Sequence, residues 1–251
     1  MVAQPITSLQ HPVVKKLVKL REDRSFRLEL GTLLIVGSAV VQEVAQRRPI
    51  KTLISTNPLP LNAADVYLGS EAIVQKIIGH KTDDLVAAEV EIPSHGDLHN
   101  CSRIVVLDEL ADPGNVGTIF RTALAFGWDG IIMIKGSVDP YNDKALRASR
   151  AAPLFLPWRE MSWEEVKTFA QRRKFQVVVA DTQGTPLPKM KFSPPIMLVM
   201  GHETRGPSEE ALKLGNSLTI PMKQEVESLN VSAAAAILLY TIHEAMYEPI
   251  P

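Results

Sequence analysis

The most informative segment of the chain lies near the C-terminus and reads Thr219-Ile220-Pro221-Met222-Lys223-Gln224-Glu225-Val226-Glu227-Ser228-Leu229-Asn230-Val231-Ser232. It joins the end of a short apolar strand to a long apolar helix through a polar turn. Apolar residues then recur at helical spacing, which predicts a helix with one deeply packed face; they are Val231, Ala234, Ala235, Leu238, Leu239 and Ile242. Either Ser228 or Asn230 suits the N-cap of that helix, because a short polar side chain can accept from its first N–H groups. The turn therefore has a capping explanation besides any role in binding.

Length and charge permit several classes of protein. A chain of 251 residues with 45% hydrophobic residues can form two domains with buried cores. The formal net charge of −1 gives no bulk attraction to nucleic acid, although basic side chains gather in two segments. These are Lys15, Lys16, Lys19, Arg21, Arg24 and Arg27 in the first, and Lys144, Arg147, Arg150 and Arg159 in the second. Each segment is either a solvated helix face or a surface that contacts RNA.

Cysteine and histidine usage narrows the setting of the protein. Cys101 is the single cysteine, which excludes an internal disulfide and fits a reducing compartment. The six histidines show no metal-ligand spacing, so no metal site is predicted. No apolar run approaches the roughly 20 residues that a membrane-spanning helix needs. We therefore expect a soluble, cytoplasmic protein with no membrane partner.

Strand-like and helical segments alternate in both halves of the chain. In the first half we expect a helix over residues 11–30, ended by Gly31, and then short segments at 33–36, 38–47, 52–55, 66–68, 71–78 and 85–92. This alternation predicts a small α/β domain with a partly parallel sheet over residues 1–92. The polar residues 93–101 break both periodicities and are interpreted as a linker.

The second half, residues 102–251, repeats the alternation with stronger signals. Buried-type strands are expected at 103–107, 130–134, 175–180 and 196–200, and helices at 114–126, 144–149 and 163–173. The first of these strands leads into Asp112-Pro113-Gly114-Asn115-Val116-Gly117-Thr118-Ile119-Phe120-Arg121. Asn115 in the turn and Arg121 on the helix can meet one ligand, or they can be a helix cap and a solvated cation.

A third polar constellation follows the strand at 196–200 and reads Gly201-His202-Glu203-Thr204-Arg205-Gly206-Pro207-Ser208. Glycines in such a turn let backbone groups approach a ligand closely. Glu203 is either part of that site or an ordinary surface carboxylate.

Taken in chain order, the stretches at 112–121, 201–208 and 219–232 resemble the first, second and third motifs of the SpoU–TrmH family of RNA ribose 2′-O-methyltransferases. The match is strong from residue 102 to about 244 and loose in the first ninety or so residues, whose opening resembles the substrate-binding domain of many members. The sequence departs from the family pattern at three places: Val36 replaces a usual glutamate, Thr204 replaces a small residue, and Gln224-Glu225 replaces a glycine. Glycine there would permit positive φ, so the last departure affects loop geometry.

The resemblance implies a fold and a reaction. The fold is a SPOUT-type parallel α/β sheet with a deep trefoil knot, preceded by a small α/β RNA-binding-like domain. The cofactor is S-adenosylmethionine, held largely by main-chain groups, with contacts from Gly201, Ile220 and Leu229. The active-site residues carried over are Asn115, Arg121, Glu203, Ser228 and Asn230. The family is typically dimeric, and its substrate is RNA, here more readily rRNA than tRNA.

Arginine is essentially always protonated, so Arg121 is expected to hold a phosphate next to the reacting ribose rather than to act as the base. Two other classes of function stay open. One is a catalytically silent RNA-binding paralogue that acts in ribosome assembly, motivated by Thr204 and Gln224. The other is a Rossmann-like dehydrogenase, which the missing glycine fingerprint and acidic residue disfavour.

Overall fold

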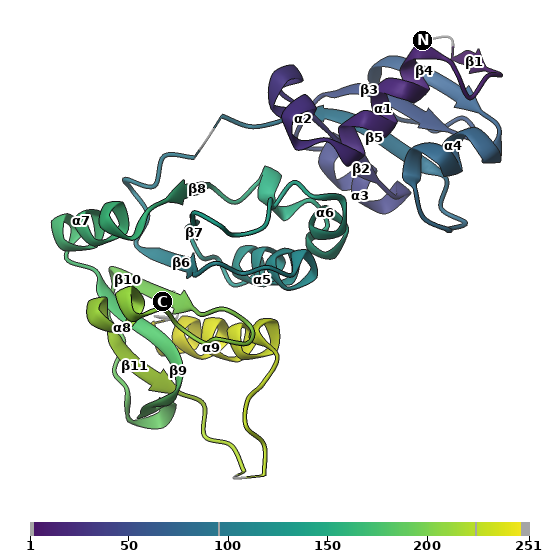
Figure 1. Ribbon diagram of the computed structural model, residues 1–251. Helices are drawn as coiled ribbons and strands as arrows, with labels where there is room; N and C mark the ends of the chain where they lie inside the picture. Colours follow the sequence, from purple (N-terminus) through teal and green to yellow (C-terminus); the bar gives the residue numbers. More distant parts are fainter. Residues whose placement is uncertain (1–2, 95, 224, 247–251) are drawn as a thin grey trace, which may run out of the picture. The chain divides into compact units, whose positions relative to one another are not determined.

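The chain forms two compact units, each built on its own β-sheet (Figure 1). The structure is a computed structural model that describes residues 3–94, 96–223 and 225–246. The first unit comprises Met1–Ser94 with Tyr141–Ala151, and the second comprises His95–Pro140 with Ala152–Pro251. Residues 141–151 thus group with the first unit although they lie within the predicted second domain; the domain boundaries at 92 and 102 stay a prediction.

The first unit contains a five-stranded sheet in the order β1-β4-β3-β5-β2. The first two pairings are parallel and the last two are antiparallel, so the sheet is partly parallel, as predicted. Its strands are β1 (Gln4–Ile6), β2 (Thr32–Val36), β3 (Ile50–Ser55), β4 (Ala63–Gly69) and β5 (Val86–Glu91). Its helices are α1 (Pro12–Glu22), α2 (Arg24–Leu30), α3 (Ser38–Ala45), α4 (Glu71–Ile78) and α6 (Asp143–Ser149).

The single helix predicted over residues 11–30 is wrong, because the chain breaks at Asp23. Asp23 has extended dihedral angles (φ −114°, ψ 110°), so it ends α1 and begins α2. Its carboxylate accepts from the N–H of Phe26 at 3.0 Å, which makes it the N-cap of α2. Gly31 then ends α2 in the left-handed conformation at φ 62°, as predicted.

The first basic segment is largely occupied by structural contacts. Arg21 donates to the carbonyls of Lys76 and Ile77 at the end of α4, and Arg27 is buried and donates to the carbonyl of Leu20. Lys16 pairs with the buried carboxylate of Glu89. In the second basic segment, Arg147 pairs with Asp143 and Arg150 pairs with Glu43.

The second unit contains a six-stranded sheet in the order β11-β9-β10-β6-β7-β8, and each of its pairings is parallel. Its strands are β6 (Arg103–Leu107), β7 (Gly130–Ile134), β8 (Trp158–Met161), β9 (Gln176–Pro186), β10 (Ile196–Met200) and β11 (Asn216–Thr219). Its helices are α5 (Pro113–Ala125), α7 (Trp163–Arg173), α8 (Glu209–Leu214) and α9 (Val231–Met246), with short 3₁₀ turns at Ala152–Leu154 and Leu187–Lys189. The predicted parallel α/β fold is confirmed.

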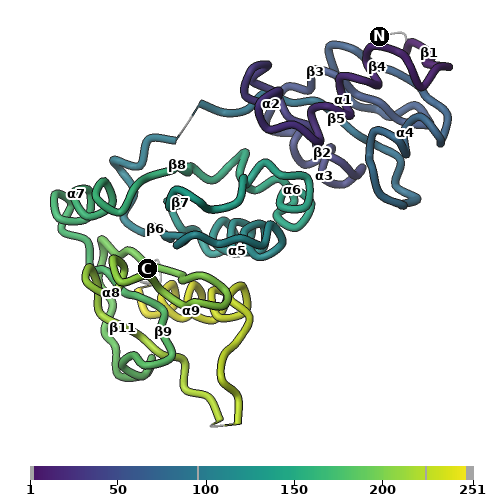
Figure 2. Tube along the Cα trace, in the orientation of Figure 1, coloured from purple at the N-terminus to yellow at the C-terminus, as the bar shows by residue number. Residues whose placement is uncertain are grey.

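Helices cover both faces of this sheet, which explains why its central strands are apolar runs rather than alternating ones. Val166 and Ala170 of α7 and Ala211 of α8 join one core with alternate residues of the strands. On the other face, α5 and α9 lie side by side (Figures 1 and 2). The loops that carry the three motifs leave this sheet.

Candidate active site

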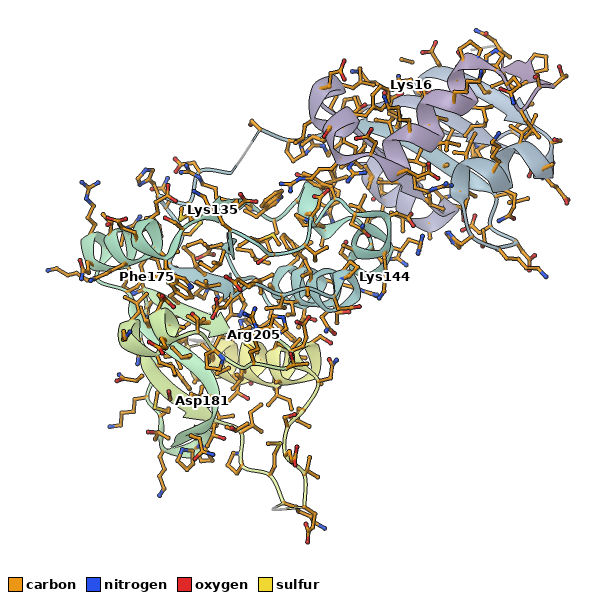
Figure 3. The ribbon with its side chains drawn as sticks, in the orientation of Figure 1. Lys16, Lys135, Lys144, Phe175, Asp181 and Arg205 are labelled. Atoms are coloured by element: carbon orange, nitrogen blue, oxygen red, sulfur yellow. The ribbon has the colours of Figure 1, made fainter. Side chains whose placement is uncertain are left out.

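The three motif loops follow three strands of the second sheet; β6 and β10 are neighbours, and β9 separates β10 from β11. The first begins after Leu107 of β6, the second after Met200 of β10, and the third after Thr219 of β11. In a parallel sheet the carboxyl ends of the strands lie at one edge, where ligands of open α/β sheets usually bind. Figure 3 shows Arg205, from the second loop, and Asp181, from β9, on this part of the molecule.

A chain of hydrogen bonds joins residues at the three loops; of these, Asn115 lies in the first turn of α5 rather than in the turn before it. The Asn115 side-chain Nδ2 donates to Oε1 of Glu203 at 3.2 Å, and its Oδ1 accepts from Nδ2 of Asn230 at 3.1 Å. Glu203 also accepts from the backbone N–H groups of Ala111 at 3.3 Å and Asp112 at 3.1 Å. These partners are 88 and 115 residues apart in sequence, so the contacts fix the three loops against one another.

The environment of Glu203 keeps its carboxylate ionised. Burial disfavours the charged form, but hydrogen bonds from its own backbone, Asp112, Asn115 and Ala111 outweigh burial and lower the pKa of Glu203 below its ordinary value. Every one of these donors is neutral. A carboxylate with a lowered pKa is a weak base, so Glu203 serves better to position the loops than to accept a proton.

Asn230, and not Ser228, is the N-cap of α9. Its Oδ1 accepts from the N–H of Ser232 at 2.9 Å and of Ala233 at 3.3 Å, and its carbonyl accepts from the N–H of Ala234. Asn230 therefore combines capping with the contact to Asn115. Each side-chain amide carries two N–H donors, and the second donor of Asn115 and of Asn230 has no partner among the described residues.

A cavity of about 470 Å³ adjoins these loops, and most of the other residues predicted for the site line it. Gly201, Ile220 and Leu229, predicted as cofactor contacts, line it together with Glu203 and Ser228. A methyl group at Gly201 would lie 2.4 Å from the backbone nitrogen of Pro207, so the close approach of the loop requires glycine.

Strand β9 contributes one wall of this cavity through an irregularity. Its register with β11 moves from Ser217 opposite Val179 to Leu218 opposite Thr185, so residues 180–184 bulge out of the ladder. Asp181 and Thr182 of this bulge line the cavity. Thr219 of β11 donates to the carbonyl of Thr182 at 3.2 Å and holds the bulge in place.

Arg121 lies apart from the other predicted residues within one chain. It is exposed on α5, six residues after Asn115, and it is not among the described residues that line the cavity. Six residues correspond to about 240° around a helix, so the two side chains project in different directions. Its guanidinium has no ion pair or hydrogen bond to the residues in 3–94, 96–223 and 225–246.

Asp108 is a site-supporting residue to which the sequence analysis assigned no role. It is 2% exposed, and its carboxylate accepts from the indole of Trp163 at 3.2 Å and from the N–H of Ser208 at 2.7 Å. It therefore ties the end of β6 to the start of α7 and to the N-cap of α8. The sequence signal that could have identified Asp108 is its place, as an acidic residue, directly after the apolar strand at 103–107.

The departures from the family pattern affect this site differently. Thr204 donates its N–H to Nδ1 of His202 within the loop, and the contacts of Glu203 are intact beside it. Gln224 lies outside the described residues. Neither a helix long and apolar enough to cross a membrane nor a cluster of three metal-binding side chains occurs in the part of the chain that the structure describes.

The sequence pattern of the SpoU rRNA Methylase family matches residues 102–240, more than half of the 251 residues. This chain belongs to that family. The predicted family and the predicted activity as an RNA methyltransferase are therefore confirmed, and the dehydrogenase alternative is set aside.

Relatives extend the similarity to nearly the whole chain. An uncharacterized tRNA/rRNA methyltransferase of Synechocystis is 31% identical, covering 94% of this chain and 92% of the relative. The 23S rRNA (guanosine(2553)-2′-O)-methyltransferase of Bacillus subtilis is 28% identical, covering 94% and 97%. A crystal structure of an AdoMet-bound rRNA methyltransferase from Sinorhizobium meliloti superposes with a TM-score of 0.84 at 27% identity, covering 98% and 99%.

Proposed function

We propose that this chain transfers a methyl group from S-adenosylmethionine to a ribose 2′-hydroxyl of rRNA. The observation that carries the proposal is the hydrogen-bonded chain Glu203–Asn115–Asn230, which joins the three motif loops beside one cavity. The name of the Bacillus subtilis relative supports both the 2′-O position and the rRNA class of substrate. tRNA is the less favoured substrate.

The residues around the cavity fit S-adenosylmethionine. A cavity of about 470 Å³ falls within the usual range for sites of this ligand size. Apolar side chains (Leu218, Ile220 and Leu229) suit an adenine ring, and the carboxylates of Asp181 and Glu227 suit positively charged groups. Gly201 lets backbone groups reach the ligand. When bound, S-adenosylmethionine supplies a methyl group on a positively charged sulfur, which is an electrophile.

The chain's own residues position the acceptor hydroxyl. The hydroxyl of Ser228, which lines the cavity, and the second N–H of Asn230, two residues later, suit the ribose. Asn115 and Glu203 hold the loops in place, which supplies catalysis through positioning. Arg121 holds a neighbouring phosphate, because its guanidinium stays protonated and offers a planar set of donors.

A homodimer would complete this arrangement. Arg121 is exposed and does not line the cavity of its own chain, so a second copy brings it to the ribose. Helix α9, which packs beside α5, exposes the apolar side chains of Ile237 and Tyr240, 40% and 49% exposed. We also propose the other features expected from the sequence: a trefoil knot in the second domain, RNA binding by residues 1–92, a linker at 93–101 and a cytoplasmic location.

The decisive experiment pairs binding with mapping. Calorimetric titration should show binding of S-adenosylmethionine to the purified chain, and rRNA from cells lacking the gene should gain one 2′-O-methyl group on incubation with both. Transfer to a base instead of a ribose would overturn the proposed position. Absence of cofactor binding would instead favour the silent paralogue.

A further inference from the structure

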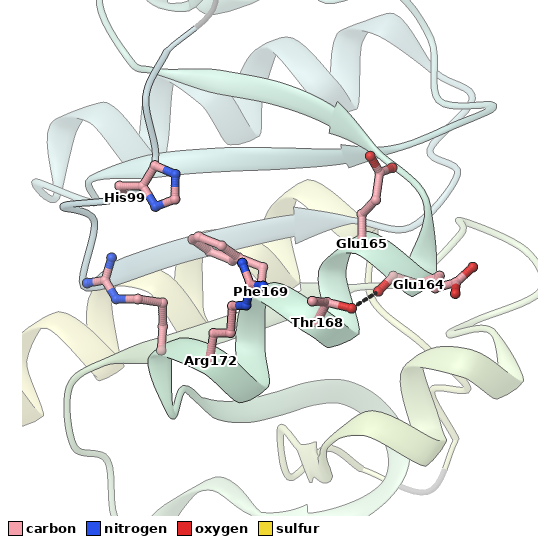
Figure 4. Close-up of a pocket in the computed structure, with 7 residues that line it drawn as sticks. His99, Glu164, Glu165, Thr168, Phe169 and Arg172 are labelled. Atoms are coloured by element: carbon pink, nitrogen blue, oxygen red, sulfur yellow. Dashed lines mark hydrogen bonds between the residues drawn. The ribbon is translucent and has the colours of Figure 1, made fainter.

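We propose that a groove along α7 binds unpaired RNA nucleotides that flank the target nucleotide. The inference rests on the proposed function, because it assumes that the substrate is RNA. The groove has a volume of about 420 Å³ and is formed within the second unit (Figure 4). The residues that line it are His99, Glu164, Glu165, Thr168, Phe169, Arg172 and Arg173. We call it the α7 groove.

Two aromatic rings form a platform in the α7 groove. The rings of His99 and Phe169 lie 6.4 Å apart in an edge-on arrangement, and Phe169 also contacts Phe175 at 5.5 Å. Phe175 is buried, so it holds Phe169 in place, whereas His99 is exposed. Proteins that bind single-stranded RNA use such rings to stack bases, and every base offers a stacking face.

Two arginines end the same helix. Arg172 and Arg173 are the last residues of α7, and their guanidinium groups form no ion pair or hydrogen bond with the described residues. Most of the cations discussed above pair with acids or bind backbone carbonyls within the chain. Arginines that the fold leaves without an acidic partner, beside an aromatic platform, suit phosphates.

The other end of the α7 groove is acidic, which bears on the class of partner. Glu165 is engaged by the fold: it accepts from the N–H and the hydroxyl of Ser162, and it lies 3.9 Å from Lys135. Glu164 remains exposed and can accept from N–H groups on a base edge. Cations, aromatic rings and one acceptor match a nucleotide better than they match an apolar protein segment.

The position of the α7 groove separates it from the reaction site. Phe175 precedes β9, and β9 reaches the cofactor cavity at Ala180 and Asp181. The five strand residues between them span about 17 Å, so the groove and the cofactor cavity lie at different ends of this part of β9. The groove would therefore contact nucleotides other than the target. Changes in the groove should therefore alter RNA affinity and leave the methyl-transfer step unchanged.

The test compares two double variants of the second unit. One is the groove variant, Arg172→Ala with Arg173→Ala, and the other is a control that removes two other exposed cations, Lys189→Ala with Lys191→Ala. Neither control residue lines the groove. The groove variant should bind a fluorescein-labelled oligouridylate about tenfold more weakly, and its salt slope should fall by about 1.4. His99→Ala should weaken the same binding about fivefold. Binding of the oligouridylate paired with oligoadenylate should change less.

With rRNA from cells lacking the gene, the groove variant should raise KM about tenfold at an unchanged kcat. Affinity for S-adenosylmethionine should be unchanged. The proposal would be overturned if the groove variant kept the wild-type oligouridylate affinity and salt slope, or if the control variant lost as much affinity as the groove variant. Either result would favour a protein as the occupant of the groove. Should the wild-type chain methylate no RNA, the proposed function fails, while the oligouridylate measurements still decide whether the groove binds RNA.

Discussion

Two carboxylates, one in each unit, are both held in the ionised form but by different partners. Glu89 lies in the first unit, is 1% exposed, and accepts from Lys16 at 2.7 Å, Thr32 at 2.9 Å and Thr52 at 2.8 Å. Glu203 lies in the second unit and, among the described residues, accepts from neutral N–H groups alone. Its nearest basic atom is Nδ1 of His202, at 3.9 Å.

The difference extends to the cations of the two units. Lys16 of the first unit (Figure 3) is paired with Glu89, whereas Arg121 of the second has no acidic partner among the described residues. Polar groups that satisfy one another stabilise the fold and have little capacity left for a ligand. Groups left without an opposite charge are available to a charged ligand. The comparison therefore separates a structural charge pair from a candidate reaction site.

Arg121→Ala tests the functional half of this comparison most strongly. Single-turnover methylation of rRNA should slow by about 10²–10³, because a contact that strengthens in the transition state is lost. Arg121→Lys keeps the charge but loses the planar fork, so it should retain measurable turnover without a steep rise with pH. Thermal unfolding and S-adenosylmethionine affinity should match the wild-type protein in both. A wild-type rate from Arg121→Ala would remove this residue from the site.

Mixing two inactive variants tests whether a second copy supplies Arg121. Arg121→Ala and Ser228→Ala chains, each slow alone, should regain about a quarter of the wild-type rate after subunit exchange, because half of the dimers then hold one intact site of two. Sedimentation should show dimers at micromolar concentration. A monomer with full activity, or a mixture no faster than its components, would refute the shared site.

Glu203→Gln should have the next largest effect. The new amide presents a donor to the N–H groups of Ala111 and Asp112, so at least one donor loses its acceptor. The cost is about 2–3 kcal/mol, expressed as a slower rate through displaced loops. Stopped-time methylation assays would measure it, with Glu210→Gln on α8 as an exposed control. Equal rates in the two variants would show that the hydrogen-bonded chain is not needed.

Glu89→Gln should instead affect stability and leave the reaction site intact. Removing the charge that Lys16 neutralises should cost about 2 kcal/mol in free energy of unfolding of the first unit. Hydrogen exchange of β2, β3 and β5 would report it, while S-adenosylmethionine binding stays unchanged. Unaltered exchange in these strands would argue against a stabilising role for the pair.

The same residue predicts a pH dependence. Burial raises the pKa of Glu89, but hydrogen bonds from Lys16, Thr52 and Thr32 outweigh burial and bring it below its ordinary value of 4.5. Because the folded-state pKa is lowered, the stabilisation is present above pH 4.5 and is lost as the pH falls below that value. Glu89→Gln should therefore flatten the acid loss of stability in the first unit.

Regular elements were predictable where local signals were complete. Residues 103–107, 130–134, 163–173 and 196–200 match β6, β7, α7 and β10 end to end. They are apolar runs bounded by polar turns, or a helix with a capping box at Ser162. The break at Asp23 was missed because the apolar periodicity continues across it. Strand β8 was missed because it has exposed Arg159 and Glu160 at its centre and lies at the sheet edge.

Contacts between distant residues were not predictable from the sequence. Lys16 was grouped with its basic neighbours because its partner, Glu89, is 73 residues away. The site residues came from the resemblance, and no local pattern indicates that Asn115 bridges Glu203 and Asn230. The separation of Arg121 from the cavity depends equally on how α5 is oriented against the sheet. Periodicity indicates which face of an element is buried, but not which polar group lies opposite.

The smallest expected effects come from two neighbouring lysines of α1, and they test the comparison most sharply. Lys15 is exposed and has no partner among the described residues, whereas Lys16 neutralises Glu89. Of these two residues of the first basic segment, Lys15 is therefore the one whose charge is available to a phosphate. Lys15→Gln should weaken rRNA binding a few-fold and lower its salt slope by about 0.7–0.9, with stability unchanged. Lys16→Gln should leave the salt slope unchanged and destabilise the first unit by about 1 kcal/mol, since its 40% exposed side chain is partly screened by water. Filter binding across salt concentrations, beside hydrogen exchange, would measure both. If Lys16→Gln alone lowered the salt slope, Lys16 would be a phosphate contact. Its pairing with Glu89 would then not mark it as purely structural, which contradicts the comparison of the two units.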